Sequence, residues 1–244
     1  MAGTFAYSAG KRLGWLAQRL GRVERPYLIT GPQAAYEYHH WLAPLENLAT
    51  IQVYAGDVPA WQGIADDGCT VFETPPTVAQ VRARREAVIL EPTLEPERYR
   101  RRRVSDGLVF VAAEDLCLDL VERARGETSP AEASAILLAR RDSLAWDVLL
   151  DQASRRGLTR LLGALIEATN AELGVSIAPV EFIRQLHRLA AAERAPHAGR
   201  GYPPGRRQTI SAEYSSLAER WGIRWLLPRH VIGKVVFDLQ PLRG

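Results

Sequence analysis

The amino-acid sequence predicts an α/β (α+β) domain followed by a helical bundle and a small basic C-terminal segment. Short apolar runs alternate with segments of helical periodicity as far as residue 92, which is typical of a sheet flanked by helices. From residue 114 to 173 the periodicity is almost entirely helical. The charge also changes, because residues 1–174 have a net charge of −3 and residues 175–244 a net charge of +6. We therefore divide the chain into domains at 1–112 and 113–174 and a basic segment at 175–244.

In the first domain, strands are expected where apolar and β-branched residues gather between turn-forming residues. They are predicted at 27–30, 48–55, 69–74, 86–92 and 108–113. Helices are predicted between them, at 10–22, 33–42, 58–65 and 76–85. The remaining residues of this domain, 93–107, are predicted to form a charged connection.

The second domain is predicted to contain helices at 114–125, 130–141, 144–156 and 158–173. The connections between these helices are short, so a small bundle is expected. The C-terminal segment is predicted to contain helices at 179–194 and 211–222, an exposed linker rich in Pro, Gly and Arg at 195–208, and a closing strand at 230–239.

Composition indicates a soluble cytoplasmic protein. No apolar run approaches the roughly 18 to 20 residues that span a bilayer, and residues 1–20 lack the apolar core of a signal peptide, so no membrane association is expected. Cys69 and Cys117 lack the spacing of a disulfide framework or a zinc site. The adjacent histidines His39 and His40 point about 100° apart on a helix, so they do not chelate one ion from it. No metal or cofactor is predicted.

The stretch "YLITGPQAAYEYHH" predicts a strand, a turn and a helix. In this arrangement Gly31 could approach an anion or a nucleotide phosphate at the positive end of the helix. The alternative is a tight turn without a ligand, which the absence of a GxGxxG or Walker pattern favours.

Acidic residues open the helix predicted at 114–125. Asp115, Asp119 and Glu122 follow at helical spacing on one face, which suits a metal or general-base cluster. The alternative is that acids in the first turn complement the helix dipole and pair with nearby arginines.

The strongest charge feature is the run "RYRRRR", which contains Arg98, Arg100, Arg101, Arg102 and Arg103. Guanidinium groups this close repel one another unless anions share them, so a phosphate, as in a nucleic acid, or an acidic protein surface is a natural partner. Pairing with the acidic helix that follows is an equal alternative. Arg206 and Arg207, near the C-terminal end of the predicted linker, are further candidates for contact with a nucleic acid or a partner.

Several segments together resemble the AbiEi-type antitoxins of bacterial type IV toxin-antitoxin systems. They are "YLITGPQAAYEYH", "IQVYAGDVPAW", "VFVAAEDLCLDLVERARG" and "WDVLLDQASRRGLTRLLGALIEATN", within about residues 10–174. The resemblance implies a nucleotidyltransferase-like mixed sheet in the first domain and a possible cognate toxin protein as partner.

The resemblance also implies where catalytic carboxylates would lie. Active nucleotidyltransferases carry two acids at alternating positions of the strand after the turn, and such residues share a face and can hold the same divalent ions. Here that strand reads Thr50-Ile51-Gln52-Val53-Tyr54, and Glu91 is the only acid near the third position. A non-catalytic, antitoxin-like binding protein is therefore expected. Two alternatives stay open: a divergent Mg-dependent nucleotidyltransferase that uses Asp115, Asp119 and Glu91, and a nucleic-acid-binding regulator.

Overall fold

The computed structural model describes residues 9–122, 128–192, 210, 212–224 and 226–240. These residues form two compact units. The first contains the described residues up to 37 together with 43–112, and the second contains 38–42 together with the described residues from 113 onward. The division after residue 112 falls where the sequence changes from alternating to helical periodicity. The predicted linker 195–208 lies outside the described residues, and so do Arg206 and Arg207 within it. Residues 193 and 194, which precede the linker, are also outside.

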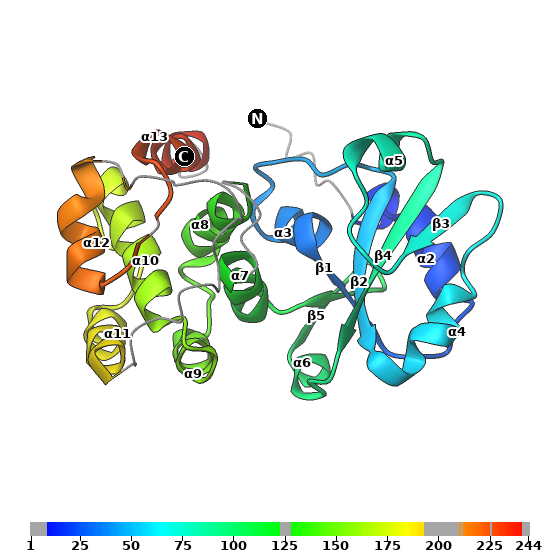
Figure 1. Ribbon diagram of the computed structural model, residues 1–244, viewed down its shortest axis with the longest axis horizontal. Coiled ribbons are helices and arrows are strands. Elements are labelled where there is room, and N and C mark those ends of the chain that lie inside the picture. Colours follow the sequence, from blue (N-terminus) through cyan, green and yellow to red (C-terminus); the bar gives the residue numbers. More distant parts are fainter. Residues whose placement is uncertain (1–8, 123–127, 193–209, 211, 225, 241–244) are drawn as a thin grey trace, which may run out of the picture. The chain divides into compact units, whose positions relative to one another are not determined.

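A mixed sheet forms the centre of the first unit (Figure 1). Its described strands are β1 (Tyr27–Thr30), β2 (Leu48–Tyr54), β3 (Cys69–Phe72), β4 (Glu86–Thr93), β5 (Arg102–Ser105) and β6 (Leu108–Val111). They are arranged in the order β3-β4-β2-β1-β6-β5. The β1–β2 and β5–β6 pairs are antiparallel, whereas β1–β6, β2–β4 and β3–β4 are parallel. The predicted mixed α/β architecture is therefore confirmed.

The described helices of the first unit are short. They are α1 (Ala9–Arg12), α2 (Gly14–Leu20), α3 (Gly31–His39), the 3-10 helix η1 (Ala55–Asp57), α4 (Val58–Gln62), α5 (Val78–Arg82) and α6 (Glu97–Arg100). The last two residues of α3 belong to the second unit by their contacts. The segment 93–107, predicted to be a connection, instead contains α6 and β5, so that prediction was wrong.

One face of the sheet is apolar. The neighbours Leu90, Ile51, Ile29 and Phe110 form a row across four strands, and each of them is buried. Residues paired across strands share a face, so this row and the residues two positions away from its members define what we call the apolar face. The opposite side is the polar face.

Helices α3 and α4 cover the apolar face. The ring of Trp61 in α4 meets the ring of Tyr27 edge to face at 5.7 Å, and the hydroxyl of Ser105 donates a hydrogen bond of 2.9 Å to Glu37 in α3. Tyr27 and Ser105 both lie on the apolar face. Tyr27 is two residues before Ile29, and Ser105 pairs with Leu108, which is two residues before Phe110. Burial of this face supplies the main hydrophobic core of the unit.

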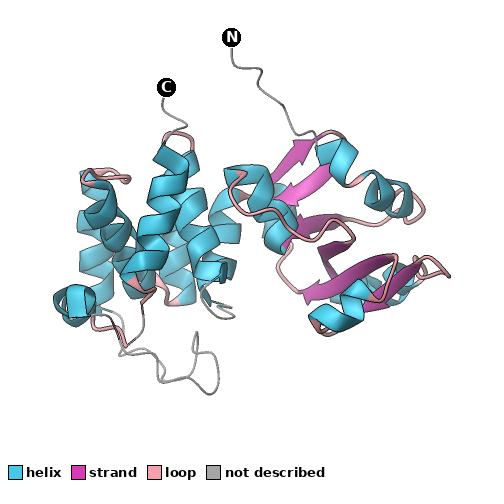
Figure 2. Ribbon diagram, turned by 90° about the horizontal axis from the view of Figure 1, so that it is seen from above, coloured by secondary structure: helices cyan, strands magenta, loops and turns pink. Residues whose placement is uncertain are grey.

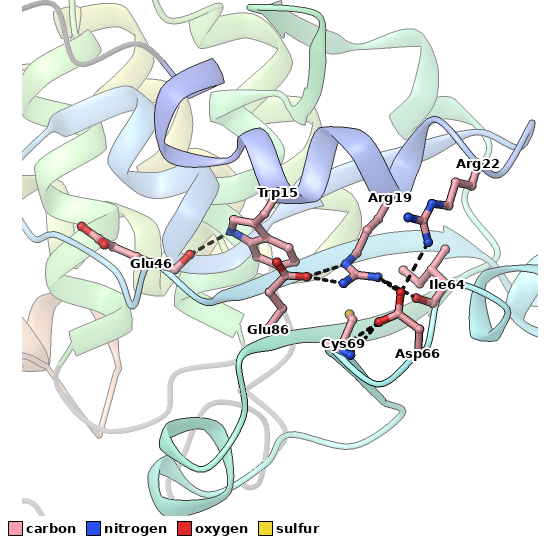
Figure 3. A network of polar contacts seen from close by, with 9 residues as sticks. Trp15, Arg19, Arg22, Glu46, Ile64, Asp66, Cys69 and Glu86 are labelled. Atoms are coloured by element: carbon pink, nitrogen blue, oxygen red, sulfur yellow. Dashed lines mark hydrogen bonds and ion pairs between the residues drawn. The ribbon is translucent and has the colours of Figure 1, made fainter.

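Arg19 joins α2 to the same side of the sheet (Figure 3). Its Nε donates to Glu86 Oε2 at 2.6 Å, and its Nη1 donates to Asp66 Oδ2 at 2.6 Å. The other carboxylate oxygen of Asp66 accepts hydrogen bonds from the backbone N–H groups of Gly68 and Cys69. Hydrogen bonds from Arg19 and from this turn hold the pKa of the Asp66 carboxyl below its ordinary value. The guanidinium thus ties together a helix, a turn and the start of β4.

The second unit is helical in its described part (Figure 2). Its helices are α7 (Ala113–Glu122), α8 (Thr128–Arg140), α9 (Trp146–Arg156), α10 (Thr159–Leu173), α11 (Val180–Ala192), the 3-10 helix η2 (Ala212–Tyr214), α12 (Ser215–Trp221) and α13 (Arg229–Leu239). Helix α10 packs against α11, α12 and α13, so the helices before and after residue 174 share one core. None of the described helices is long and apolar enough to cross a membrane.

The prediction of a closing strand at 230–239 was wrong, because this segment forms α13. Its buried residues are Ile232, Val235, Val236 and Leu239, which follow the i, i+3, i+4, i+7 spacing of a helix face. The β-branched residues predicted a strand locally, but packing against α8 and α10 outweighs that preference.

A close contact anchors α12 on α10. The indole of Trp221 lies against Gly163, where an added Cβ would come within 2.1 Å of the ring. The indole Nε1 also donates to Glu167 Oε2 at 3.0 Å. Position 163 therefore requires a glycine for this packing.

We predict that Arg19→Met lowers the free energy of unfolding by about 2 to 4 kcal/mol, because Glu86 loses its partner in a partly buried site. Urea unfolding followed by circular dichroism measures the change. The matched control is Arg22→Met. Arg22 is exposed and its contact with Asp66 is longer, at 3.4 Å. The free energy of unfolding is therefore expected to change by less than about 0.5 kcal/mol. Equal effects of the two substitutions would contradict the role given to Arg19.

We also predict that Glu132 makes the protein less stable as the pH rises. Glu132 is 2% exposed in α8, and burial raises its pKa to about 7 from an ordinary value of 4.5. Between these pH values the folded state holds a proton that the unfolded state has released, so the free energy of unfolding falls with increasing pH.

Glu132→Gln should remove this dependence and raise the free energy of unfolding at pH 8 by about 2 to 3 kcal/mol. At pH 4 the two proteins should have similar stability. Urea unfolding at several pH values measures both effects, and a parallel pH dependence in the two proteins would contradict the prediction.

Candidate functional site

The polar face of the sheet carries Thr50 and Gln52 of β2, the strand on which the sequence shows no carboxylate. Thr30 lies beside Thr50, and Gln52 lies beside Glu91, on neighbouring strands. Thr93 continues this face further along β4, beside Tyr54. We call Thr30, Thr50, Gln52, Glu91 and Thr93 the polar row.

Burial makes the polar row unusual. Thr30, Thr50 and Thr93 are between 2% and 8% exposed, Gln52 is fully buried, and Glu91 is partly exposed. The same face also carries buried apolar residues, since Leu28 lies beside Gln52 and Ile89 beside Thr50. A buried polar group without a hydrogen bond costs free energy, so the polar row stands out among these neighbours. The polar row is therefore the strongest candidate for a functional site in the first unit.

Gln52 is the clearest member. Neither its side-chain oxygen nor its side-chain nitrogen has a hydrogen-bond partner in the part of the chain that the structure describes. Gln33 differs in its amide nitrogen, because its Nε2 donates to the backbone oxygens of Leu45 and Leu48 at 2.7 and 2.6 Å, although its Oε1 also has no hydrogen-bond partner among the described residues. Leaving a buried amide unsatisfied costs about 1 to 3 kcal/mol, so Gln52 is not explained by stability.

A turn at Gly31 borders the polar row. Gly31 has a φ of 63°, in the left-handed region, and begins α3 directly after β1. An added Cβ would lie 3.4 Å from Thr50 Oγ1, so both the backbone conformation and the space favour glycine. The start of α3 therefore lies beside Thr50, and the first backbone N–H groups of a helix are the groups that could bind an anion. Pro32 contributes no N–H there.

Helix α6 borders the row further along β2. The hydroxyl of Tyr99 donates to the backbone oxygen of Gln52 at 3.2 Å, and its ring stacks on Tyr54 with a centroid distance of 4.6 Å. Burial raises the pKa of the Tyr99 phenol well above its ordinary value, so this group stays a hydrogen-bond donor at neutral pH.

The acids considered for catalysis are divided between the two units. Glu91 lies in the polar row, whereas Asp115 and Asp119 are buried in α7 of the second unit. Asp119 accepts a hydrogen bond of 2.8 Å from Arg156, which also contacts Glu122. This ion pair accounts structurally for part of the acidic pattern. Within the described residues, no group of three or more His, Cys, Asp or Glu side chains could hold a metal ion.

The arginine run does not form a uniform cluster. Arg98 is buried within 3.7 Å of Glu95, and Arg103 lies 3.5 Å from Glu37. Arg100 and Arg102 are exposed, and Arg101 is partly exposed. Arg100, Arg101 and Arg102 are therefore the arginines of this run that are most accessible to a partner.

Sequence reasoning missed the β5–β6 hairpin, which carries Arg102 and Arg103 of these five arginines. Asp106 and Gly107 form its two-residue turn with φ values of 49° and 76°. An Asp-Gly pair between strands is a strong hairpin signal, and it was present in the sequence. Glu37, which holds Arg103 and Ser105, gave no local signal because it lies far away along the chain.

His39 and His40 do not form a site together. His39 is buried, its Nδ1 accepts a hydrogen bond of 2.9 Å from the backbone of Trp41, and burial lowers its pKa to about 3. His40 is exposed and has a φ of 51°. The pair marks the end of α3.

Comparisons of the chain with known protein families, with curated proteins and with solved structures find no match. The resemblance to AbiEi-type antitoxins accordingly stays a prediction from the sequence motifs.

We predict that Gln52→Met raises the free energy of unfolding by about 1 to 2 kcal/mol, because an unbranched apolar side chain replaces an unsatisfied buried amide. Gln33→Met is the matched control and should destabilise the protein, since it leaves two backbone oxygens without their donor. Urea unfolding measures both. A destabilised Gln52→Met protein would show that the amide has a stabilising partner.

Proposed function

We propose that this chain is a non-catalytic, antitoxin-like protein that uses a nucleotidyltransferase-like sheet as a scaffold and acts by binding a partner protein. One observation carries the proposal. Thr50 and Gln52, at alternating positions of β2, both lie on the polar face, and neither is an acid. Glu91 is the one acid in the polar row.

The chemistry of phosphoryl transfer supports a loss of catalysis. Two divalent ions stabilise the attacking and leaving oxygens, and carboxylates hold those ions. Mg²⁺ prefers charged oxygen ligands and is bound through one or two carboxylates. Threonine and glutamine at positions 50 and 52 are neutral. Glu91 alone supplies too little negative charge for a two-metal site.

The exposed arginines support a binding role. Arg100 and Arg102 are exposed, although Arg100 lies 3.3 Å from Glu97 and Arg102 donates to the backbone oxygen of Tyr99 at 2.7 Å. Arg101 is partly exposed beside them. Arginine is enriched at protein interfaces and pairs with carboxylates through two parallel hydrogen bonds. An acidic surface on a cognate toxin is the partner that this chemistry and the sequence resemblance favour.

A second candidate is nucleic-acid binding, which the net charge of +6 over residues 175–244 favours. Arg206 and Arg207 would contribute to it. Such binding would weaken steeply with added salt, because the protein releases counterions from the phosphates.

The test is a transfer assay with the purified chain, labelled nucleoside triphosphates, Mg²⁺ or Mn²⁺, and RNA or protein as acceptors. The expected result is no incorporation above that of the Glu91→Gln variant. Metal-dependent incorporation that is lost in Glu91→Gln, Asp115→Asn or Asp119→Asn would overturn the proposal in favour of a divergent nucleotidyltransferase. Salt-sensitive binding to duplex DNA or RNA in the same preparations would favour the second candidate.

A further inference from the structure

Strand β5 ends the described sheet and exposes an unusual edge. It pairs with β6 on one side only, so its other side is the margin of the sheet. Asp106 and Gly107 connect the two strands, and their positive φ values are those of a type I′ turn. Such a turn fixes the pairing register of a hairpin.

The register determines which backbone groups point outward. Ser105 and Leu108 flank the two-residue turn, so this pair exchanges both of its backbone hydrogen bonds. Antiparallel pairs alternate, and therefore Arg103 also bonds to β6. The N–H and C=O groups of Arg102 and Val104 consequently point away from β6. No hydrogen bond to any of these four groups occurs within the described part of the chain.

The side chains make this edge accessible. Val104 is 63% exposed, and Arg102 is exposed on the same face of the strand. Arg103 and Ser105 point to the other face, where both contact Glu37 at 3.5 and 2.9 Å. Contacts on one face thus hold the strand in place. On the opposite face Arg102 Nη1 donates to the backbone oxygen of Tyr99 at 2.7 Å, while the side chain of Val104 and the outer edge are accessible.

Proteins usually protect an edge strand, because unpaired N–H and C=O groups with an exposed apolar side chain can bind another strand. Here the arginines select the partner. Exposed Arg100 and Arg102 favour an acidic segment, whereas a second copy of this chain would bring the positive charges of two β5 strands together. Charge complementarity therefore points to an acidic partner.

We propose that the outer edge of β5 binds an extended acidic segment of a partner protein by strand addition, with Arg102 and Val104 supplying the backbone hydrogen bonds. This inference rests on the proposed binding function and names the surface that performs it. Backbone pairing would give affinity, and contacts of Val104, Arg102 and Arg100 with alternate side chains would give specificity.

Val104→Pro tests the inference. Proline removes the outward N–H at position 104 but no hydrogen bond of the β5–β6 hairpin, since that group does not point to β6. Val104→Thr is the matched control, because it keeps the N–H and the β-branched shape. Thermal unfolding of both variants shows whether the fold is retained.

The probe is a fluorescent peptide of alternating valine and glutamate, titrated with the full chain by fluorescence anisotropy. Val104→Pro should weaken binding at least about tenfold, and Val104→Thr less than about threefold. Methylation of alternate backbone nitrogens of the peptide should cause a loss similar to that of Val104→Pro, because it blocks strand pairing. A peptide with lysine in place of glutamate should not bind.

Three results would overturn the inference. They are absence of binding by the acidic peptide, binding that neither Val104→Pro nor backbone methylation weakens, and self-association of the chain that Val104→Pro abolishes. The last result would assign the edge to a second copy. None of them affects the transfer assay, so failure of the strand-addition site and failure of the non-catalytic function are distinguishable.

Discussion

The alternation of side chains along β2 is the constraint on which both faces of the sheet depend. Ile51 and Val53 point to the apolar face and are fully buried, whereas Thr50 and Gln52 point to the polar face. A slip of one residue would exchange the two sets, so the packing of α2, α3 and α4 fixes the register strongly. The hydrophobic core on one side therefore fixes which residues meet on the other. Glycine at position 31 adds the start of α3 to that group.

The same alternation divides the arginine run. In β5, Arg103 has its side chain on the apolar face and lies near Glu37, while Arg102 has its side chain on the polar face and is exposed. A stretch that appears uniform in the sequence thus separates into side chains on the apolar face and exposed side chains on the polar face, where Arg102 also donates to the backbone oxygen of Tyr99 at 2.7 Å. Because Glu37 belongs to α3, the helix that begins beside Thr50 also holds the edge strand. The candidate site and the outer edge share this one helix.

Local sequence patterns predicted most elements of the sheet and the helices from 113 to 173, since their apolar spacing is regular. They failed at α13, where Ile232, Val235 and Val236 predict a strand by composition but pack as a helix face. The positions of Thr50, Gln52 and Glu91 on the sheet followed from period-two alternation. The contact between Glu37 and Ser105 could not be predicted, because it depends on strand order and not on local sequence. Whether Gln52 has a hydrogen-bond partner likewise depends on the packed structure.

The central claim is that the polar row lacks the charge to hold catalytic metal ions. Binding of Mn²⁺, followed by electron paramagnetic resonance during titration of the wild-type chain and Glu91→Gln, tests this claim most directly. The account predicts the same weak, nonspecific binding for both proteins, because Thr50 and Gln52 contribute no carboxylate. A tight, stoichiometric Mn²⁺ site that is lost in Glu91→Gln would contradict it.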